Sequence, residues 1–79
     1  MRRKYDSPIA TRLGVSPGML AELGSALLRE TKGDPPFVMG TAGQGLVRRG
    51  LAERGKPSWE MRINAAGRAL FERARKMGW

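Results

Sequence analysis

The chain is 79 residues long and contains neither cysteine nor histidine. Without these residues it has no disulfide bonds and lacks the usual zinc ligands, so non-covalent packing must hold this small domain together and its stability should be modest. Apolar residues make up 41% of the sequence, more than is typical of a disordered basic tail. We therefore expect one folded domain over residues 6–79, preceded by a flexible basic arm at residues 1–5.

The sequence is strongly basic. Fifteen Lys and Arg oppose seven Asp and Glu, giving a net charge of +8. Such a charge favours partners rich in phosphate or carboxylate groups. The absence of thiols and imidazoles removes common nucleophiles and general bases, so we expect no enzymatic activity, catalytic residue, metal, cofactor or small-molecule substrate. The sequence has no membrane-spanning run and no signal-peptide pattern, which favours the cytoplasm of a bacterial host and no membrane partner.

Proline and glycine divide the first half of the chain. A Ser-Pro pair opens a helix twice, at residues 8–13 and at residues 17–32. Gly14 and Gly33 follow these segments, as expected where helices end. The apolar residues at helical spacing in the longer segment are Met19, Leu20, Leu23, Leu27 and Leu28. The pattern predicts two consecutive helices, of which the second packs one face against the core.

A third helix is expected in the middle of the chain. Thr41, with Gln44 three residues later, fits a capping box and predicts a helix over residues 41–49, ended by Gly50. Two glycines inside this segment each cost about 1 kcal/mol relative to alanine, so tertiary packing must hold it. Residues 37–39 form a short apolar run, which is either a strand stub or a hydrophobic entry into this helix.

The pattern after Gly50 predicts a β-hairpin. Residues 51–54 and 59–63 flank a turn-rich quartet, and Trp59, Met61 and Ile63 alternate with charged residues, as in a half-buried strand. This alternation favours a core position for Trp59, although an aromatic ring in a basic protein can also stack on a base.

A last helix is expected over residues 65–76, capped by Asn64. Its expected inner stripe consists of Ala66, Ala69, Leu70, Arg73 through its stem, Ala74 and Met77. Trp79 beyond it either docks on the body of the domain or marks an interaction surface. These elements predict an α+β fold of three to four helices with an antiparallel hairpin of two or three strands.

Two segments carry a resemblance to a known family. The sequence LVRRGLAE at residues 46–53 resembles the end of the recognition helix and the first wing strand of winged-helix DNA-binding domains. The sequence RINAAGRAL at residues 62–70 resembles their second wing strand and the following helix. The resemblance, over residues 41–75, implies a small winged-helix-like domain with the hairpin as its wing and a role on nucleic acid. The family has a second helix just before the recognition helix, whereas residues 33–40 carry no helical pattern.

Candidate binding residues lie around the expected hairpin. Five cations without acidic partners at helical spacing are candidates for phosphate contact: Arg48, Arg49, Arg54, Lys56 and Arg62. Gln44 is the one plausible base reader of the third helix, since its amide can pair with a base edge. The alternative is that arginines simply cover a solvated surface. A second basic group is explained by the helix dipole and by solubility: Arg73, Arg75 and Lys76.

Two alternative functions are therefore the main hypotheses. The first is a non-enzymatic nucleic-acid-binding module of a phage or mobile element, with DNA favoured over RNA. The second is an inhibitor, because in size and composition the chain resembles small phage-encoded anti-CRISPR proteins. Such a protein would dock on an acidic surface of a nucleoprotein complex, such as a CRISPR effector, and block its DNA binding. A third hypothesis, which also fits the positive charge, is a structural or ribosome-associated protein.

Overall fold

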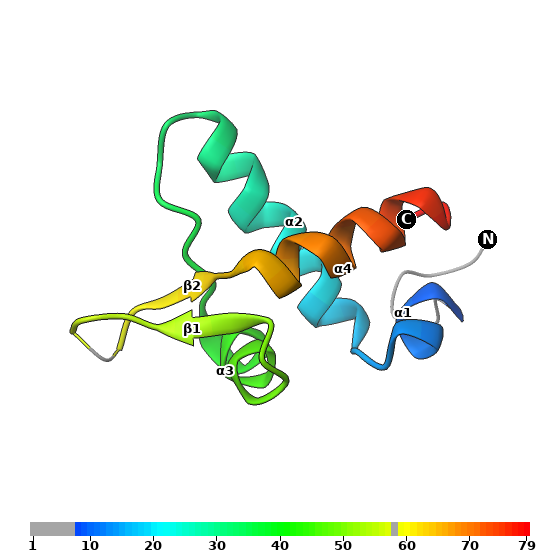
Figure 1. Ribbon diagram of the computed structural model, residues 1–79, viewed down its shortest axis with the longest axis horizontal. Helices are drawn as coiled ribbons and strands as arrows, with labels where there is room; N and C mark the ends of the chain where they lie inside the picture. The colour runs from blue at the N-terminus through cyan, green and yellow to red at the C-terminus, as the bar shows by residue number, and fades with distance from the viewer. Residues whose placement is uncertain (1–7, 58) are drawn as a thin grey trace.

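The structure is a computed structural model that describes residues 8–57 and 59–79 (Figure 1). It has an α+β fold of four helices and a two-stranded antiparallel hairpin within these residues. The elements in chain order are α1 (Pro8–Leu13), α2 (Pro17–Thr31), α3 (Gly40–Arg48), β1 (Ala52–Arg54), β2 (Met61–Ile63) and α4 (Ala65–Lys76). None of these helices is long and apolar enough to cross a membrane. The arm predicted at residues 1–5 lies outside the described residues.

The prediction for α2 is confirmed to within one residue. The Ser16 hydroxyl accepts a hydrogen bond of 3.1 Å from the backbone N–H three residues later, which caps the helix. The packed face contains Leu20, Leu23 and Ala26, all fully buried. Leu28, which was expected among the apolar contacts, is instead 59% exposed. The face of α2 that packs in the core is therefore narrower than the apolar pattern of the sequence.

The core lies where α2 and α4 cross, with α3 and the hairpin beside them (Figure 1). The largest fully buried side chains are Leu20, Leu23, Val38 and Leu46. Met61 and Ile63 on β2 are also buried and belong to this core. In Figure 1 the hairpin turn projects at one end of the molecule, far from α1 and from the C-terminal end of α4. Its turn is therefore open to a large partner.

A short extended segment pairs with the edge of the hairpin. Phe37 forms an isolated antiparallel bridge with Arg62. Next to it, the Val38 N–H donates to the Met61 carbonyl at 2.8 Å, and the Ile63 N–H donates to the Pro36 carbonyl at 3.1 Å. Of the two expectations for residues 37–39, the strand stub is therefore the one that the structure has.

The prediction that Trp59 belongs to the core is wrong, since 77% of this residue is exposed. The Glu60 N–H donates to the Pro57 carbonyl at 3.1 Å, and the Gly55 N–H donates to the Glu60 carbonyl at 2.8 Å. These bonds close the turn around Trp59, and β2 begins only at Met61. The alternation in the sequence therefore begins before the strand does, and it includes Trp59, which lies in the turn and not in β2.

The bounds predicted for α4 are confirmed, and Asn64 caps it by accepting a 2.9 Å hydrogen bond from the Gly67 N–H. The predicted inner stripe is partly wrong, because Ala66, Ala69 and Arg73 are exposed. Ala74 is buried as predicted, and the packed face also passes through Gly67, which the predicted stripe did not include. The stripe was misassigned because a glycine was not counted as a packing residue.

Candidate functional site

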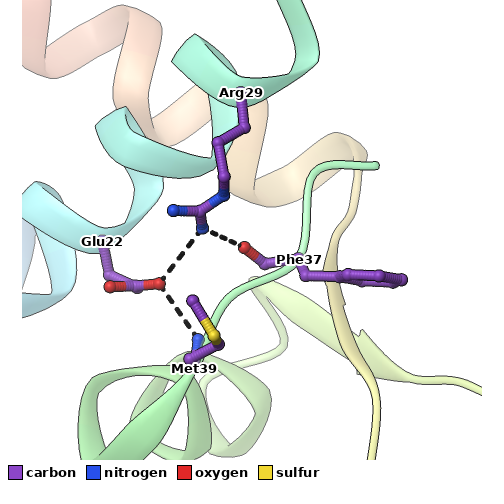
Figure 2. A network of polar contacts seen from close by, with 4 residues as sticks. All are labelled: Glu22, Arg29, Phe37 and Met39. Atoms are coloured by element: carbon purple, nitrogen blue, oxygen red, sulfur yellow. Dashed lines mark hydrogen bonds and ion pairs between the residues drawn. The ribbon is translucent and has the colours of Figure 1, made fainter. Parts of the chain in front are cut away.

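The start of α3 is held by a carboxylate from α2. The capping box predicted from Thr41 and Gln44 is wrong, because α3 begins at Gly40 and its N-cap residue, Met39, has no side-chain cap. The Met39 N–H donates instead to Glu22 Oε2 at 3.0 Å (Figure 2). In a capping box, a side chain of the same helix accepts the hydrogen bond from the N-cap N–H. Here the acceptor is Glu22, which belongs to α2.

Arg29 completes this network (Figure 2). Its Nη2 atom lies 3.5 Å from Glu22 Oε2 and donates to the Phe37 carbonyl at 2.5 Å. The two charged side chains are 33% and 21% exposed, so water screens the pair only in part. The network fixes residues 37–39 on α2, and in this way it sets the position of α3.

We expect Glu22→Ala to lower the free energy of unfolding by about 1 to 2 kcal/mol, because Met39 loses its acceptor and Arg29 its carboxylate. Alanine is at least as good a helix former as glutamate, so α2 itself is not weakened. Urea unfolding followed by circular dichroism measures the change, and hydrogen exchange of the Met39 amide should become faster. Glu72→Ala on the exposed side of α4 is the control. Equal stability of the two variants would contradict the role assigned to Glu22.

One side of α3 is polar and exposed. Thr41, Gln44 and Arg48 follow each other at spacings of three and four residues, and all three are exposed. On the packed side, a Cβ added at Gly45 would overlap the methyl group of Met19. The missing side chain lets α3 approach α2 closely and leaves its polar side outward, so Gln44 is placed where a partner can reach it.

Arg49 differs from Arg48 in having a contact within the domain. Its Nε atom donates to the Gly14 carbonyl at 3.0 Å, which ties the end of α3 to the end of α1. Arg48 lies in the last turn of α3 and is exposed. Arg49 therefore has a structural role besides any contact with a partner, whereas Arg48 is held by no such bond.

The cations of the hairpin point in different directions. Glu53 pairs with Arg62 in the register, and Arg54 pairs with Met61. Neighbouring residues of a strand alternate between faces, so Arg54 and Arg62 lie on opposite faces of the hairpin. The Arg62 guanidinium lies 5.0 Å from the centroid of the Phe37 ring, on the face away from the core.

The five predicted cations therefore occupy three places and not one patch. Arg48 and Arg49 end α3, Arg54 and Lys56 lie toward the turn of the hairpin, and Arg62 lies on its outer face. Within residues 8–57 and 59–79, no carboxylate forms an ion pair with Arg48, Lys56 or Arg62. These three positive charges are available to a partner.

A second surface lies between α2 and α4. It is a groove of about 790 Å³ with an apolar floor that includes Leu27, Leu28 and Phe71. Trp79 also lines it and is half-buried, so the C-terminal aromatic docks on the body of the domain. Sequence reasoning missed this groove. The sequence does contain a signal, because Leu28 directly after Leu27 makes the apolar pattern of α2 wider than the face that packs in the core.

An ion pair borders the groove. Arg68 donates from Nη1 and Nη2 to the two carboxylate oxygens of Glu30, at 2.6 and 2.5 Å. These hydrogen bonds hold the pKa of the Glu30 carboxyl below its usual range and raise the pKa of Arg68. Both side chains remain open to solvent, so the pair links α2 to α4 without contributing much stability.

No protein-family model matches the chain, and neither a curated protein nor a solved structure does. Three surfaces of the structure are candidates for a functional contact. They are the exposed side of α3, the hairpin with its cations, and the groove between α2 and α4.

Proposed function

We propose that the protein is a non-enzymatic nucleic-acid-binding module in which α3 and the hairpin contact phosphates. The observation that carries the proposal is the exposure of Arg48, Lys56 and Arg62, none of which has an ion pair within the described residues. The ion pairs of Arg29 with Glu22 and of Arg68 with Glu30 use cations of α2 and α4 instead. Guanidinium and ammonium groups bind phosphate oxygens through charge-assisted hydrogen bonds, so a polyanion is the natural ligand of this surface.

The order of elements around the hairpin supports a winged-helix-like reading. α3 leads into the hairpin, α4 follows it, and Phe37 adds a short third extended segment. Only one helix lies between Phe37 and β1, where winged helices have a pair. In this proposal Gln44 is the single base reader on α3, and binding depends weakly on sequence because the other contacts are to phosphate.

The test is a titration of a fluorescein-labelled mixed-sequence duplex, followed by anisotropy at several salt concentrations. Each phosphate contact contributes about 0.9 to the slope of log K against log salt. We expect the triple variant Arg48→Gln, Lys56→Gln and Arg62→Gln to bind more weakly and to reduce that slope by about 3. Arg49 is left unchanged because its contact with Gly14 supports the fold.

The matched control removes three other exposed cations: Arg12→Gln, Arg73→Gln and Lys76→Gln. Both triple variants have the same net charge, so a non-specific effect of charge would weaken both equally. We expect the control to keep most of the affinity and slope. Equal losses in the two variants, or no duplex binding by the unmodified protein at low salt, would refute the proposed interface.

The groove between α2 and α4 favours a second candidate function, an inhibitor that docks on a protein complex. Leu28, 59% exposed, and Phe71 offer an apolar contact that a nucleic acid does not need. The anti-CRISPR reading belongs here, with a CRISPR effector complex as the partner. Copurification with such a complex, weakened by Leu28→Asp and not by the triple variant at Arg48, Lys56 and Arg62, would favour this function over the first.

A further inference from the structure

The hairpin turn presents an aromatic ring to solvent. Trp59 is 77% exposed, whereas tryptophan usually buries most of its large apolar surface in a core or an interface. The ring comes from the segment that projects at the end of the molecule away from α1 and from the C-terminal end of α4 (Figure 1). The exposure of Trp59 therefore indicates a contact with a binding partner and not a role in packing the core.

The backbone around Trp59 is held in place. The Glu60 N–H donates to the Pro57 carbonyl at 3.1 Å, and the Gly55 N–H donates to the Glu60 carbonyl at 2.8 Å. These two bonds close the turn, and the strands behind it are paired from Arg54 and Met61 onward. A ring carried on a closed turn loses less conformational freedom on binding than one on an open loop.

Basic residues flank Trp59 along the hairpin. Lys56 lies three residues before Trp59, is exposed and has no ion pair within residues 8–57 and 59–79. Arg62 follows on β2, where its guanidinium lies over the ring of Phe37. Aromatic rings interleaved with cations bind single-stranded nucleic acids, because bases stack on the rings while the cations contact the backbone.

We propose that the hairpin turn binds unpaired bases, with Trp59 as the stacking surface and Lys56 as the neighbouring phosphate contact. A base inside a duplex is already stacked on both faces, so the ring favours single-stranded or locally opened nucleic acid over an intact duplex. The proposal rests on the nucleic-acid-binding function above and names its substrate class. DNA and RNA strands share this chemistry, and the test separates them.

The experiment compares one mixed-sequence strand of about 20 nucleotides as single-stranded DNA, as single-stranded RNA and as a DNA duplex with its complement. Anisotropy titrations use the unmodified protein, Trp59→Ala and Trp59→Phe. Because stacking on one aromatic ring is worth about 1 to 3 kcal/mol per base, we expect Trp59→Ala to weaken single-strand binding about 5- to 150-fold. Trp59→Phe should retain part of the affinity, and duplex binding should change less than about twofold in either variant.

Fluorescence provides a second readout, because the chain has only two tryptophans. Trp79→Phe leaves Trp59 as the single tryptophan and keeps an aromatic side chain at the half-buried C-terminal position. We expect a single strand to quench this emission as bases stack, whereas the affinity of Trp79→Phe stays that of the unmodified protein.

The possible results separate the two proposals. If single strands and duplex are bound but Trp59→Ala changes neither affinity, and no quenching occurs, the stacking role is refuted and the phosphate-binding function stands. If the unmodified protein binds none of the three nucleic acids at low salt, both proposals are refuted. A larger loss with the DNA strand than with the RNA strand identifies DNA as the substrate, and the reverse result identifies RNA.

Discussion

Replacing Gly67 with alanine is expected to destabilise the protein by more than about 3 kcal/mol, a large share of the roughly 4 to 12 kcal/mol typical for a chain of this size. A Cβ at this position would overlap the Leu51 carbonyl oxygen. It would also lie 2.9 Å from Ile63 Cγ1 and 3.3 Å from Leu23 Cδ2. The better helix propensity of alanine offsets only about 1 kcal/mol of this effect.

The surroundings of Gly67 cannot easily yield. The Asn64 N–H donates to the same Leu51 carbonyl at 3.3 Å, and the Asn64 side-chain amide donates to the Gly50 carbonyl at 2.9 Å. Asn64 Oδ1 accepts from the Gly67 N–H, so the first turn of α4 is fixed to the residues that enter β1. Relief of the overlap would require α4 to separate from the hairpin, which would expose the core between them.

Gly18→Ala is the matched control, because it makes the same substitution in a helix at an open position. The nearest atom to a Cβ at Gly18 is Ser16 Oγ at 3.8 Å. We expect this variant to be more stable than the parent by up to about 1 kcal/mol, with a melting temperature a few degrees higher. Thermal unfolding by circular dichroism measures both variants. A folded Gly67→Ala protein with parental stability would mean that α4 and the hairpin are not packed as described.

Local signals in the sequence were sufficient for most helix boundaries. The cap at Ser16, the cap at Asn64 and the positive φ of 73° at Gly14 act on backbone atoms within a few residues. Their effect does not depend on the rest of the fold, so α1, α2 and α4 were predicted to within one residue. The coarse α+β class follows from these helix signals together with the alternation of Met61 and Ile63 with charged residues after a turn-rich quartet.

The failures occurred where distant residues decide the local structure. The cap of α3 comes from Glu22, 17 residues before Met39, and no pattern around Thr41 reveals it. The exposure of Trp59 depends on where the hairpin turn closes, which alternation alone does not fix. For α4, the spacing of Gly67, Leu70, Phe71 and Ala74 carried the correct signal, but it is visible only if glycine is counted as a contact residue.

The sequence suggested which cations belong to the candidate site, but not on which faces they lie or which contacts they make. The sequence selects the cations because they have no acidic partners at helical spacing. In the structure Arg48, Lys56 and Arg62 are exposed, and their role in binding stays a prediction. It could not reveal that Arg54 and Arg62 lie on opposite faces, because that depends on the strand register. Nor could it reveal that Arg49 bonds to Gly14, which lies 35 residues away. A function that needs a single basic patch therefore fits this chain less well than one in which α3 and the hairpin contact different phosphates.

The second large effect is expected at Leu46, where alanine should lower the free energy of unfolding by about 2 to 5 kcal/mol. Leu46 is fully buried on α3 and belongs to the core cluster that also includes Leu20, Met61 and Ile63. Its truncation leaves a cavity between α3 and the hairpin, the two elements to which nucleic-acid binding is assigned. Leu28→Ala makes the same truncation at an exposed position and should cost less than about 1 kcal/mol.

This pair of leucines also separates stability from function. If α3 and the hairpin form the interface, a folded Leu46→Ala protein, studied at low temperature, should bind nucleic acid more weakly because α3 is no longer held firmly against the hairpin. Leu28→Ala should keep full nucleic-acid affinity, since its side chain lines the groove between α2 and α4. The opposite result, weaker nucleic-acid binding by Leu28→Ala than by Leu46→Ala, would move the nucleic-acid contact from the hairpin to that groove.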